Sequence, residues 1–563
     1  MPKTTFSAVI LFLLALPHFA GAQTEIFNID PAYDVLSRTE IEAELVRTTS
    51  NLYFYIEKSW WDTRPLEEQN DVRIALFELG EEFKNKIYPV LTTKFGSEPR
   101  PGIDQDERIV VLIHQMRQDA GGYFITGDVY SRFQYPKSNE REMIYLNSKY
   151  LMSSKEKSFL AHEFVHLITI NQKDLLRRVT EEIWLNEARA EYAPTLLGYD
   201  DVYKGSNLEN RVMAFLEKPT ISLTEWLNEK ENYGAANLFS QYLVDHYGIE
   251  VLVDSLRSSK IGIASLEEAI QKNGFQKNFS QVFADWVITL LVNDCKVGTK
   301  YCYLNKNLKD LRIVPTFYYL PRTETILSTF HTASAFSPNW HRFVGGGSNL
   351  LLQFDGEDSV RFEAPYLLCD LTNKCVVGFL VLDEKAQGKL SFPDFSEKYS
   401  SLTIMPFVKS KVSGFNGQET TFSFSWKVSV AENTQTEEEL KSQLLVRIAE
   451  LQEQLRALQV QLSLLLAGKT PQAGGISCTQ IDNDLFYGMM NNLQVSCLQE
   501  FLKNQGTYPE GLVTGNFLTL TKSAVIRFQE KYASEILSPL GLKEGTGYVG
   551  SATRAKINQL IGN

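Results

Sequence analysis

The 563-residue sequence predicts a multidomain protein with an α+β domain, a β-sandwich-like domain, a coiled-coil helix and a small all-α domain, in that order. Three observations predict this organisation. Residues 23–305 carry strand-like and then helical hydrophobic patterns. Residues 310–430 carry short alternating apolar runs between turn residues. Residues 434–466 carry a heptad repeat, and a linker at 467–477 leads to a helical pattern at 478–563.

The overall composition is that of an ordinary globular protein. Hydrophobic residues make up 44% of the chain and charged residues 22%, which excludes a disordered polymer. The chain has 56 Lys and Arg against 68 Asp and Glu, so its net charge is −12. Proteins that neutralise phosphates are usually basic over at least one face. We therefore expect no nucleic-acid partner.

The first 22 residues have the pattern of a secretory signal peptide. Lys3 supplies the positive charge, Phe6–Leu16 forms the apolar core, and Ala20-Gly21-Ala22 fits the small residues before a cleavage site. The alternative is a buried N-terminal helix. The apolar core is too short to span a bilayer comfortably, and so is the later apolar run at 286–292. The sequence thus predicts an exported protein with no membrane span.

The cysteines agree with export to an oxidising compartment. Their even number predicts disulfides, although the sequence does not determine the connectivity. We favour three local bridges because each couple lies inside one predicted domain; the alternative is six free buried thiols. The couples are Cys295 with Cys302, Cys369 with Cys375, and Cys478 with Cys497.

The longest predicted domain, residues 23–305, changes character along its length. Apolar runs bounded by polar loops predict strands at 108–114 and 143–147. From Ser153 onward the apolar residues recur with a helical period. The predicted helices are 158–170, 180–197, 236–247 and 275–292. Strands followed by helices are typical of an α+β domain.

Residues 310–430 are expected to form a β-sandwich-like accessory or substrate-presenting domain. Turn signals such as Gly345-Gly346-Gly347 and Asp355-Gly356 separate its alternating apolar runs. The predicted strands are 349–354, 359–363, 376–382, 402–407 and 421–430.

The predicted rod at 434–466 carries an apolar seam at alternating steps of four and three residues. The seam residues are Leu444, Ile448, Leu451, Leu455, Leu458, Leu462 and Leu465. One helix cannot bury such a stripe alone, so it packs on copies of itself or on a neighbouring domain. We favour self-association, which predicts a homo-oligomer of undetermined strand number.

The C-terminal unit contains two similar half-patterns. Each places a Gly-rich turn before a helix that a Thr is expected to cap, Thr521 in the first and Thr553 in the second. The run GNFLTLTKSAVIRFQ at 515–529 resembles the peptidoglycan-binding repeat family. This resemblance implies non-catalytic attachment to peptidoglycan or cell-wall glycan. The alternative is a generic helical interaction domain.

The chemistry of the chain is predicted at residues 161–191. His162 and His166 are spaced i, i+4 on a predicted helix, so both imidazoles point toward one metal. Glu163 lies between them, where its carboxylate reaches a metal-activated water. Zinc in hydrolases takes three protein ligands, and Glu187 on the next helix supplies the third. Glu191, one turn further, is expected to orient a ligand histidine. The alternative is a pair of helices with satisfied core histidines.

The sequences HEFVH and WLNEARAEY resemble the gluzincin branch of zinc metallopeptidases, and within it the hyicolysin-like peptidases. This resemblance implies a zincin-like fold and one Zn²⁺ per chain, held by His162, His166 and Glu187. It also implies Glu163 as general base. Ala188 stands where many relatives carry Gly, and we expect no loss of function from it.

Three further roles are assigned less directly. Tyr233 is the candidate hydroxyl that stabilises the oxyanion, because its place before a helix ending at Gly248 is similar to that of the catalytic Tyr of aminopeptidase-type gluzincins. His246 is the rival donor. The strand at 143–147 is expected to hold an extended substrate by edge pairing.

Together these features predict a secreted zinc endopeptidase that acts on protein or peptide substrates and is attached to a cell wall by its C-terminal module. Two alternatives stay open. One is a hydrolase of peptidoglycan cross-links, which would share the same chemistry. The other is a catalytically silent, wall-bound adhesion or scaffold protein.

Overall fold

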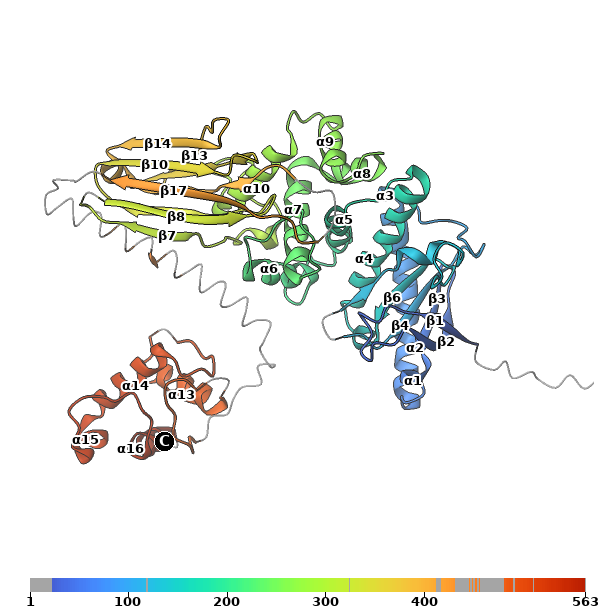
Figure 1. Ribbon diagram of the computed structural model, residues 1–563. Helices are drawn as coiled ribbons and strands as arrows, with labels where there is room; N and C mark the ends of the chain where they lie inside the picture. The colour runs from blue at the N-terminus through green and yellow to red at the C-terminus, as the bar shows by residue number, and fades with distance from the viewer. Residues whose placement is uncertain are drawn as a thin grey trace, which may run out of the picture. The chain divides into compact units, whose positions relative to one another are not determined.

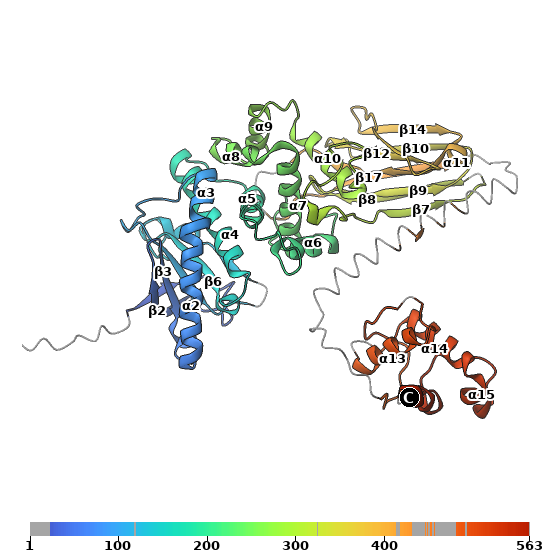
Figure 2. The same ribbon diagram turned by 180° about the vertical axis from the view of Figure 1, so that it is seen from behind.

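The computed structural model divides into two compact units, Met1–Leu465 and Leu466–Asn563 (Figures 1 and 2). It describes residues 23–117, 120–323, 325–411, 417–430, 480–489, 492–509 and 511–561, with 445, 448, 451, 452 and 455 as isolated positions. The predicted signal peptide, the linker, Cys478 and most of the predicted coiled coil lie outside these residues. Among the described helices, none has the length and apolar content to cross a membrane.

The first unit begins with a six-stranded sheet. Its order is β1-β2-β3-β4-β6-β5, with β3, β4 and β6 parallel and the other pairs antiparallel. β4 is buried at every position, as expected for a continuous apolar strand inside a parallel sheet. The strands are β1 Thr24–Asn28, β2 Glu40–Thr48, β3 Leu52–Glu57, β4 Ile109–His114, β5 Gly122–Tyr123 and β6 Met143–Asn147.

Helices cover one face of this sheet. Apolar side chains from α2, α3 and α4 share a core with inward residues of β3, β4 and β6. A smaller cluster on the opposite face includes Tyr123 and Tyr145. The helices are α1 Lys58–Trp61, α2 Leu66–Glu82, α3 Tyr88–Phe95 and α4 Glu156–Thr169, with π-turns at Phe83–Ile87 and Ile170–Leu175 and short 3-10 turns at Thr126–Val129 and Ser148–Tyr150.

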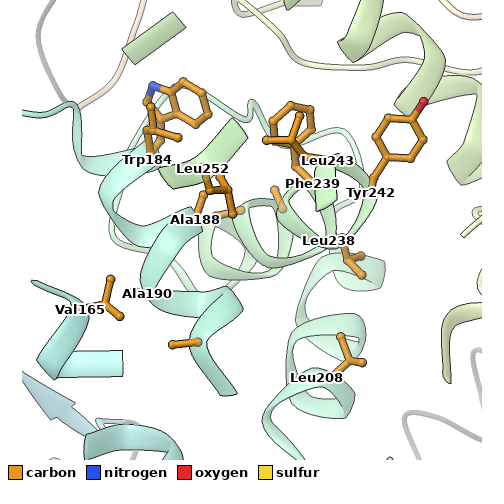
Figure 3. Packing of buried hydrophobic residues seen from close by; sticks show 14 of the residues in the cluster. Val165, Trp184, Ala188, Ala190, Leu208, Leu238, Phe239, Tyr242, Leu243 and Leu252 are labelled. Atoms are coloured by element: carbon orange, nitrogen blue, oxygen red, sulfur yellow. The ribbon is translucent and has the colours of Figure 1, made fainter. Parts of the chain in front are cut away.

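A helical lobe follows. Figure 3 shows its packing, with Trp184 and Ala188 of α5 beside Phe239 and Leu243 of α7. Small alanines on α5 allow the helices to approach closely, and the large side chains fill the remaining space. The helices are α5 Ile183–Leu196, α6 Asn207–Glu217, α7 Lys230–Tyr247, α8 Ile249–Arg257, α9 Gly262–Lys272 and α10 Phe279–Val292.

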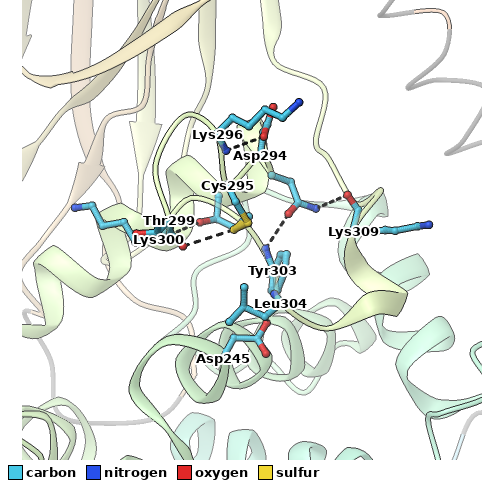
Figure 4. Close-up of a disulfide and its surroundings, with 12 residues drawn as sticks. Asp245, Asp294, Cys295, Lys296, Thr299, Lys300, Tyr303, Leu304 and Lys309 are labelled. Carbon is cyan, nitrogen blue, oxygen red and sulfur yellow. Dashed lines mark hydrogen bonds between the residues drawn. A yellow bond between two sulfur atoms is a disulfide. The ribbon is translucent and has the colours of Figure 1, made fainter.

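Disulfides close two local loops. The Cys295–Cys302 bridge follows α10. Figure 4 shows this bridge with the residues around it and their hydrogen bonds. Asp245 of α7 accepts the backbone N–H of Leu304 at 2.7 Å. The second bridge joins Cys369 to Cys375. Both are predicted pairs. Cys497 is disulfide-bonded as well, while its predicted partner lies outside the described residues.

The described part of residues 316–430 forms two facing sheets, one antiparallel and one mixed, and a short additional ladder. The sheet orders are β14-β10-β17-β8 and β13-β12-β15-β9-β7, with β7 and β9 parallel. Leu352 and Trp426 from one sheet meet Phe343 and Leu402 from the other in one core. The strands are β7 Thr316–Leu320, β8 Thr325–Ala333, β9 His341–Gly345, β10 Asn349–Gly356, β11 Phe362–Glu363, β12 Pro365–Asp370, β13 Cys375–Phe379, β14 Gln387–Pro393, β15 Tyr399–Ile404, β16 Phe407–Val408 and β17 Phe422–Val430, with α11 at Phe395–Lys398.

This sandwich also packs against the helical lobe. Phe336 lies 4.9 Å from Phe279 and 5.2 Å from Phe283, between ring centroids. Phe407 reaches Phe283 at 4.8 Å, and the Trp340 indole donates to the carbonyl of Val287. The two domains predicted at 23–305 and 310–430 therefore share a continuous apolar core.

The second unit contains two structural repeats. Gln499 accepts the N–H of Gly515 and donates to Thr521 at 2.8 Å. Thirty residues on, Gln529 does the same with Gly547 and Thr553. The predicted capping role of the two threonines is wrong, because each lies inside its helix and accepts from a buried glutamine. The helices are α13 Leu493–Asn504, α14 Thr519–Lys531, α15 Ala533–Ile536 and α16 Ser551–Ile561, with a 3-10 turn at Ser538–Leu540.

The shared core predicts that residues 23–309 are not an autonomous folding unit. Ending the chain at residue 309 exposes Phe279 and Phe283, and losing the packing of one buried aromatic costs about 3–5 kcal/mol. We expect this fragment to aggregate or to unfold without a cooperative thermal transition in circular dichroism. A chain ended at residue 430 keeps the core and should unfold cooperatively. A soluble, cooperatively folding 23–309 fragment would contradict the shared-core interpretation.

Candidate metal centre

Helix α4 brings His162 and His166 to the same side, one turn apart. The helix is buried on almost every side, with Phe164, Val165 and Leu167 in the core. Figure 3 shows Val165 of α4 and Ala190 of α5 pointing into the space between them. The two helices are therefore fixed relative to one another, and α5 presents Glu187 to the histidines.

Three ligand atoms converge at this point. The Nε2 atoms of His162 and His166 are 3.1 Å apart. Oε2 of Glu187 lies 3.2 Å from the first and 3.5 Å from the second. A tetrahedral ion with bonds of about 2.0–2.1 Å keeps its ligands roughly 3.3–3.4 Å apart. The three atoms thus have the spacing that one zinc-sized ion requires, and they form a group of potential metal ligands.

Hydrogen bonds on the far side of the rings set which nitrogen faces this point. Nδ1 of His166 lies 3.1 Å from the side-chain oxygen of Asn186, an oxygen that can only accept, so Nε2 is the nitrogen that faces the other two candidate ligands. Nδ1 of His162 faces Glu191 Oε1 at 3.4 Å. Among the described residues, Glu187 Oε2 is buried with no hydrogen-bond partner. Lone pairs that face each other repel, so this arrangement favours a proton or a cation among them.

The electrostatics of the pocket favour positive charge. Burial acts to lower the pKa of His166, but the Glu187 carboxylate outweighs it and raises this pKa to about 9. Burial likewise acts to raise the pKa of Glu187, and His166 and His162 lower it below its usual range. A site that attracts a proton this strongly is suited to a divalent cation of the size of Zn²⁺.

Glu191 is held in place behind His162. Arg211 of α6 donates to both of its carboxylate oxygens, at 2.6 and 2.9 Å. Asn207 donates to Oε2 as well. Burial acts to raise the pKa of Glu191, and the charge of Arg211 outweighs it and lowers the pKa. Glu191 therefore stays ionised and can accept a hydrogen bond from Nδ1 of His162.

Glu163 lies beside the three ligands. Its carboxylate is buried, and burial raises its pKa above that of an ordinary glutamate. A Cβ at Gly122 of β5 would lie 3.1 Å from Glu163 Cγ and 2.7 Å from the carbonyl oxygen of Tyr145. The absence of a side chain at Gly122 therefore lets strand β5 approach the carboxylate closely.

Tyr233 approaches the same cleft from the first turn of α7. Its hydroxyl donates to the Asn228 side-chain oxygen at 2.8 Å, and the Arg211 guanidinium lies 4.8 Å from its ring centre. Burial raises the pKa of Tyr233, and the charges of Glu187 and Glu163 add to this effect. The hydroxyl thus remains protonated and able to donate a hydrogen bond at neutral pH.

The three candidate metal ligands and Tyr233 line one cleft of about 590 Å³. Gly122 and Phe124 form part of one wall, and Asn228 and Lys230 form part of the other. A cleft of this volume accommodates several residues of a peptide. A peptide chain can therefore reach the candidate metal ligands and Glu163.

Two of the sequence-based roles change in the structure. His246 lies at the end of α7, where its Nε2 is 2.7 Å from the Cys302 carbonyl oxygen, so it is engaged away from the ligands. The predicted edge pairing of substrate with strand 143–147 is wrong, because β6 lies between β4 and β5. The edge next to the cleft belongs to β5, a two-residue strand too short to stand out in the sequence.

Sequence reasoning also missed Arg211, Tyr33 and Asn228, which all line the cleft. None of them belongs to a motif with a spacing that predicts chemistry. Only Asn228 had a signal in the sequence: the Asn-Glu pair at 228–229 is typical of the start of a helix. That signal does not predict a position in the cleft.

Comparison with known proteins finds two similarities. Residues 491–557 match the family described as "Putative peptidoglycan binding domain". The chain is also 32% identical over 226 residues to the neutral metalloprotease ShpI of Staphylococcus hyicus, covering 35% of this chain and 48% of that protein. The chain thus spans about half the length of this curated relative. The predicted resemblances to a metallopeptidase and to a peptidoglycan-binding domain are confirmed.

The close approach at Gly122 generates a test. In Gly122→Ala the new Cβ displaces β5 or the Glu163 side chain. A 1 Å displacement of a catalytic group can cost on the order of 100-fold in rate. We expect peptide hydrolysis to fall by roughly this factor while zinc content, measured by elemental analysis, is retained. Gly127→Ala is the matched control, because its nearest neighbour is the half-exposed Tyr135 ring at 3.3 Å. Equal rates for the two variants would contradict the interpretation that the close approach of Gly122 positions the Glu163 carboxylate.

Proposed function

We propose that this protein is an exported zinc endopeptidase held at a cell wall by its C-terminal unit. The observation that carries the proposal is the convergence of His162 Nε2, His166 Nε2 and Glu187 Oε2 at mutual distances of 3.1–3.5 Å. Glu163 stands beside them in a cleft wide enough for a peptide. The similarity to a neutral metalloprotease supports the same chemistry.

The chain supplies a base, a hydrogen-bond donor and oriented ligands. When bound, Zn²⁺ supplies a Lewis acid that polarises the scissile carbonyl and acidifies a water molecule. Glu163, whose pKa burial raises, takes the proton of the attacking water and passes it to the leaving amine. The Tyr233 hydroxyl donates to the carbonyl oxygen as that oxygen gains negative charge. Asn186 and Glu191 hold the two imidazoles in the orientation that faces the ligand group.

The second unit is proposed to bind peptidoglycan. Its match to a peptidoglycan-binding family supports this role. The surface of the unit exposes aromatic side chains, with Phe486 49% exposed, Tyr487 56% and Tyr548 44%. The rings of Phe486 and Tyr548 are stacked, with their centroids 6.3 Å apart. Exposed aromatic groups mark interaction surfaces, and flat apolar rings suit the faces of sugars.

The signal-like residues 1–22 support export, and the peptidoglycan-binding unit supports residence at the wall. The disulfides are consistent with an oxidising compartment. Self-association through residues 434–466 is part of the proposal. The described seam residues Ile448, Leu451 and Leu455 are exposed in the single chain, at 44–56%.

Removing the base should separate catalysis from metal binding. In Glu163→Gln the ligand set is intact, so zinc should remain at one ion per chain while hydrolysis falls by roughly 100- to 10,000-fold. In Glu187→Ala a ligand is lost, and zinc should leave on dialysis. Elemental analysis and cleavage of a peptide library measure both. A Glu163→Gln enzyme with near wild-type rate would refute the base assignment.

The substrate class can be decided by assaying casein and purified sacculi side by side with the zinc-loaded protein. Cleavage of casein supports the endopeptidase, and loss of peptide cross-links from the sacculi without cleavage of casein supports a cross-link hydrolase. Activity on neither substrate, with zinc bound, supports the silent scaffold.

Wall attachment predicts that Tyr548→Ala combined with Phe486→Ala weakens co-sedimentation with sacculi by roughly 30-fold or more, because truncating a central interface aromatic costs more than about 1 kcal/mol. Phe330→Ala is the control, since this ring is 81% exposed on strand β8 of the first unit. Unchanged sedimentation of the double variant would place the binding surface elsewhere.

A further inference from the structure

Three side chains from distant parts of the sequence meet above the candidate metal centre. Tyr33 comes from the loop between β1 and β2, Asn228 from the loop before α7, and Tyr233 from the first turn of α7. All three line the cleft. The first belongs to the wall formed by the sheet domain and the other two to the wall formed by the helical lobe.

The Asn228 amide connects the two tyrosines. Its oxygen accepts the Tyr233 hydroxyl at 2.8 Å. Its side chain also forms a hydrogen bond with the Tyr33 hydroxyl. Because the Asn228 oxygen already accepts from Tyr233, the amide N–H is the group left to donate to Tyr33. In this arrangement Tyr33 accepts from the amide, so its own hydroxyl proton is not used in the bond. That proton can be directed at a substrate.

The Tyr33 ring is held rigidly. It stacks on Tyr123 with ring centroids 4.6 Å apart, and Tyr123 stacks on Tyr145 at 4.4 Å. The backbone oxygen of Tyr33 accepts the N–H of Arg117, and the next residue, Asp34, is fully buried. Burial raises the pKa of Tyr33, and the carboxylates of Glu163 and Glu187 add to the rise. Tyr33 is thus a protonated, preorganised donor within electrostatic reach of Glu163 and Glu187.

Asn228 is also held in an unusual conformation. Its φ is +59°, in the left-handed region that asparagine tolerates better than most residues. The flanking backbone N–H groups of Leu227 and Glu229 both donate to the Asn232 side chain. Strained backbone at a cleft is a feature that surrounding structure must maintain. The conformation aims the amide at both hydroxyls.

We propose that Tyr33 is a second catalytic hydroxyl, which donates to the scissile carbonyl oxygen from the wall opposite Tyr233, and that Asn228 is the positioning residue that aligns the two. A carbonyl oxygen has two lone pairs, so two donors from opposite walls can bind it together. The inference rests on the proposed peptidase function and extends it to residues outside the HExxH and Asn-Glu motifs.

The test compares Tyr33→Phe, Asn228→Gly and the double variant in the full-length, zinc-loaded protein. Glycine keeps the positive φ at 228 and removes only the amide. Loss of one donor to a developing oxyanion typically costs roughly 100- to 1,000-fold in kcat. We expect Tyr33→Phe to lose at least tenfold in kcat with KM within about twofold. The double variant should lose less than the product of the single losses, because both changes act on one hydrogen bond.

A binding measurement gives a readout that does not depend on turnover. Calorimetry with a phosphinic peptide, whose tetrahedral centre resembles the transition state, should show weaker affinity for Tyr33→Phe by about the same factor as kcat/KM. The affinity of the parent peptide for Glu163→Gln should be the same with and without Tyr33→Phe. Tyr53→Phe is the matched control. Tyr53 lies on strand β3, its hydroxyl donates to Asp106, and neither residue lines the cleft.

Three outcomes are decisive. Full kcat and full phosphinic affinity in Tyr33→Phe would overturn the role of Tyr33. Multiplicative losses in the double variant would overturn the positioning role of Asn228. Absence of any cleavage by the wild-type zinc protein would refute the proposed function instead. The phosphinic-peptide affinities with and without Tyr33→Phe would then decide whether Tyr33 donates to a tetrahedral oxyanion.

Discussion

The organisation of the first unit depends on one electrostatic constraint. Two imidazole nitrogens and one carboxylate oxygen lie within 3.5 Å of each other inside the protein, and the far side of His166 is committed to donating its proton to Asn186. Such a group is stable only around positive charge. Helices α4 and α5 must therefore be fixed with little tolerance, which explains why their contact surface is apolar and tightly packed.

Residues outside the three candidate ligands hold the ligands in position. Glu191 orients His162, Arg211 neutralises Glu191, and Arg211 also lies against the Tyr233 ring. The same guanidinium thus connects a candidate metal ligand, through Glu191, to the candidate oxyanion donor. Because these contacts are buried and charged, losing one member leaves another uncompensated, so the ligand set and Tyr233 are positioned by a single network.

The sequence allowed the grouping of His162, His166 and Glu187 to be predicted because its geometry is local. Residues at i and i+4 share a helix face in any helix, and a second helix with Asn186-Glu187 needed only to pack nearby. The β-sandwich was predicted less completely: the exposed face of strand β8 carries the apolar residues Ile326 and Phe330, so its sequence shows no regular alternation of apolar and polar residues. Tyr33, Asn228 and Arg211 could not be predicted, because only tertiary packing brings their segments to the cleft.

The sandwich also reaches the candidate active-site cleft indirectly. The loop that carries Asn228 is fastened to the sandwich: Leu223 N–H donates to the Phe336 carbonyl, and Ser222 donates to that of Ala335. The backbone N–H of Glu419 donates to Glu225 in the same loop. A left-handed residue such as Asn228 keeps its conformation only where its neighbours are fixed. The second predicted domain therefore belongs to the construction of the site, since it anchors the loop from which Asn228 reaches the two tyrosines.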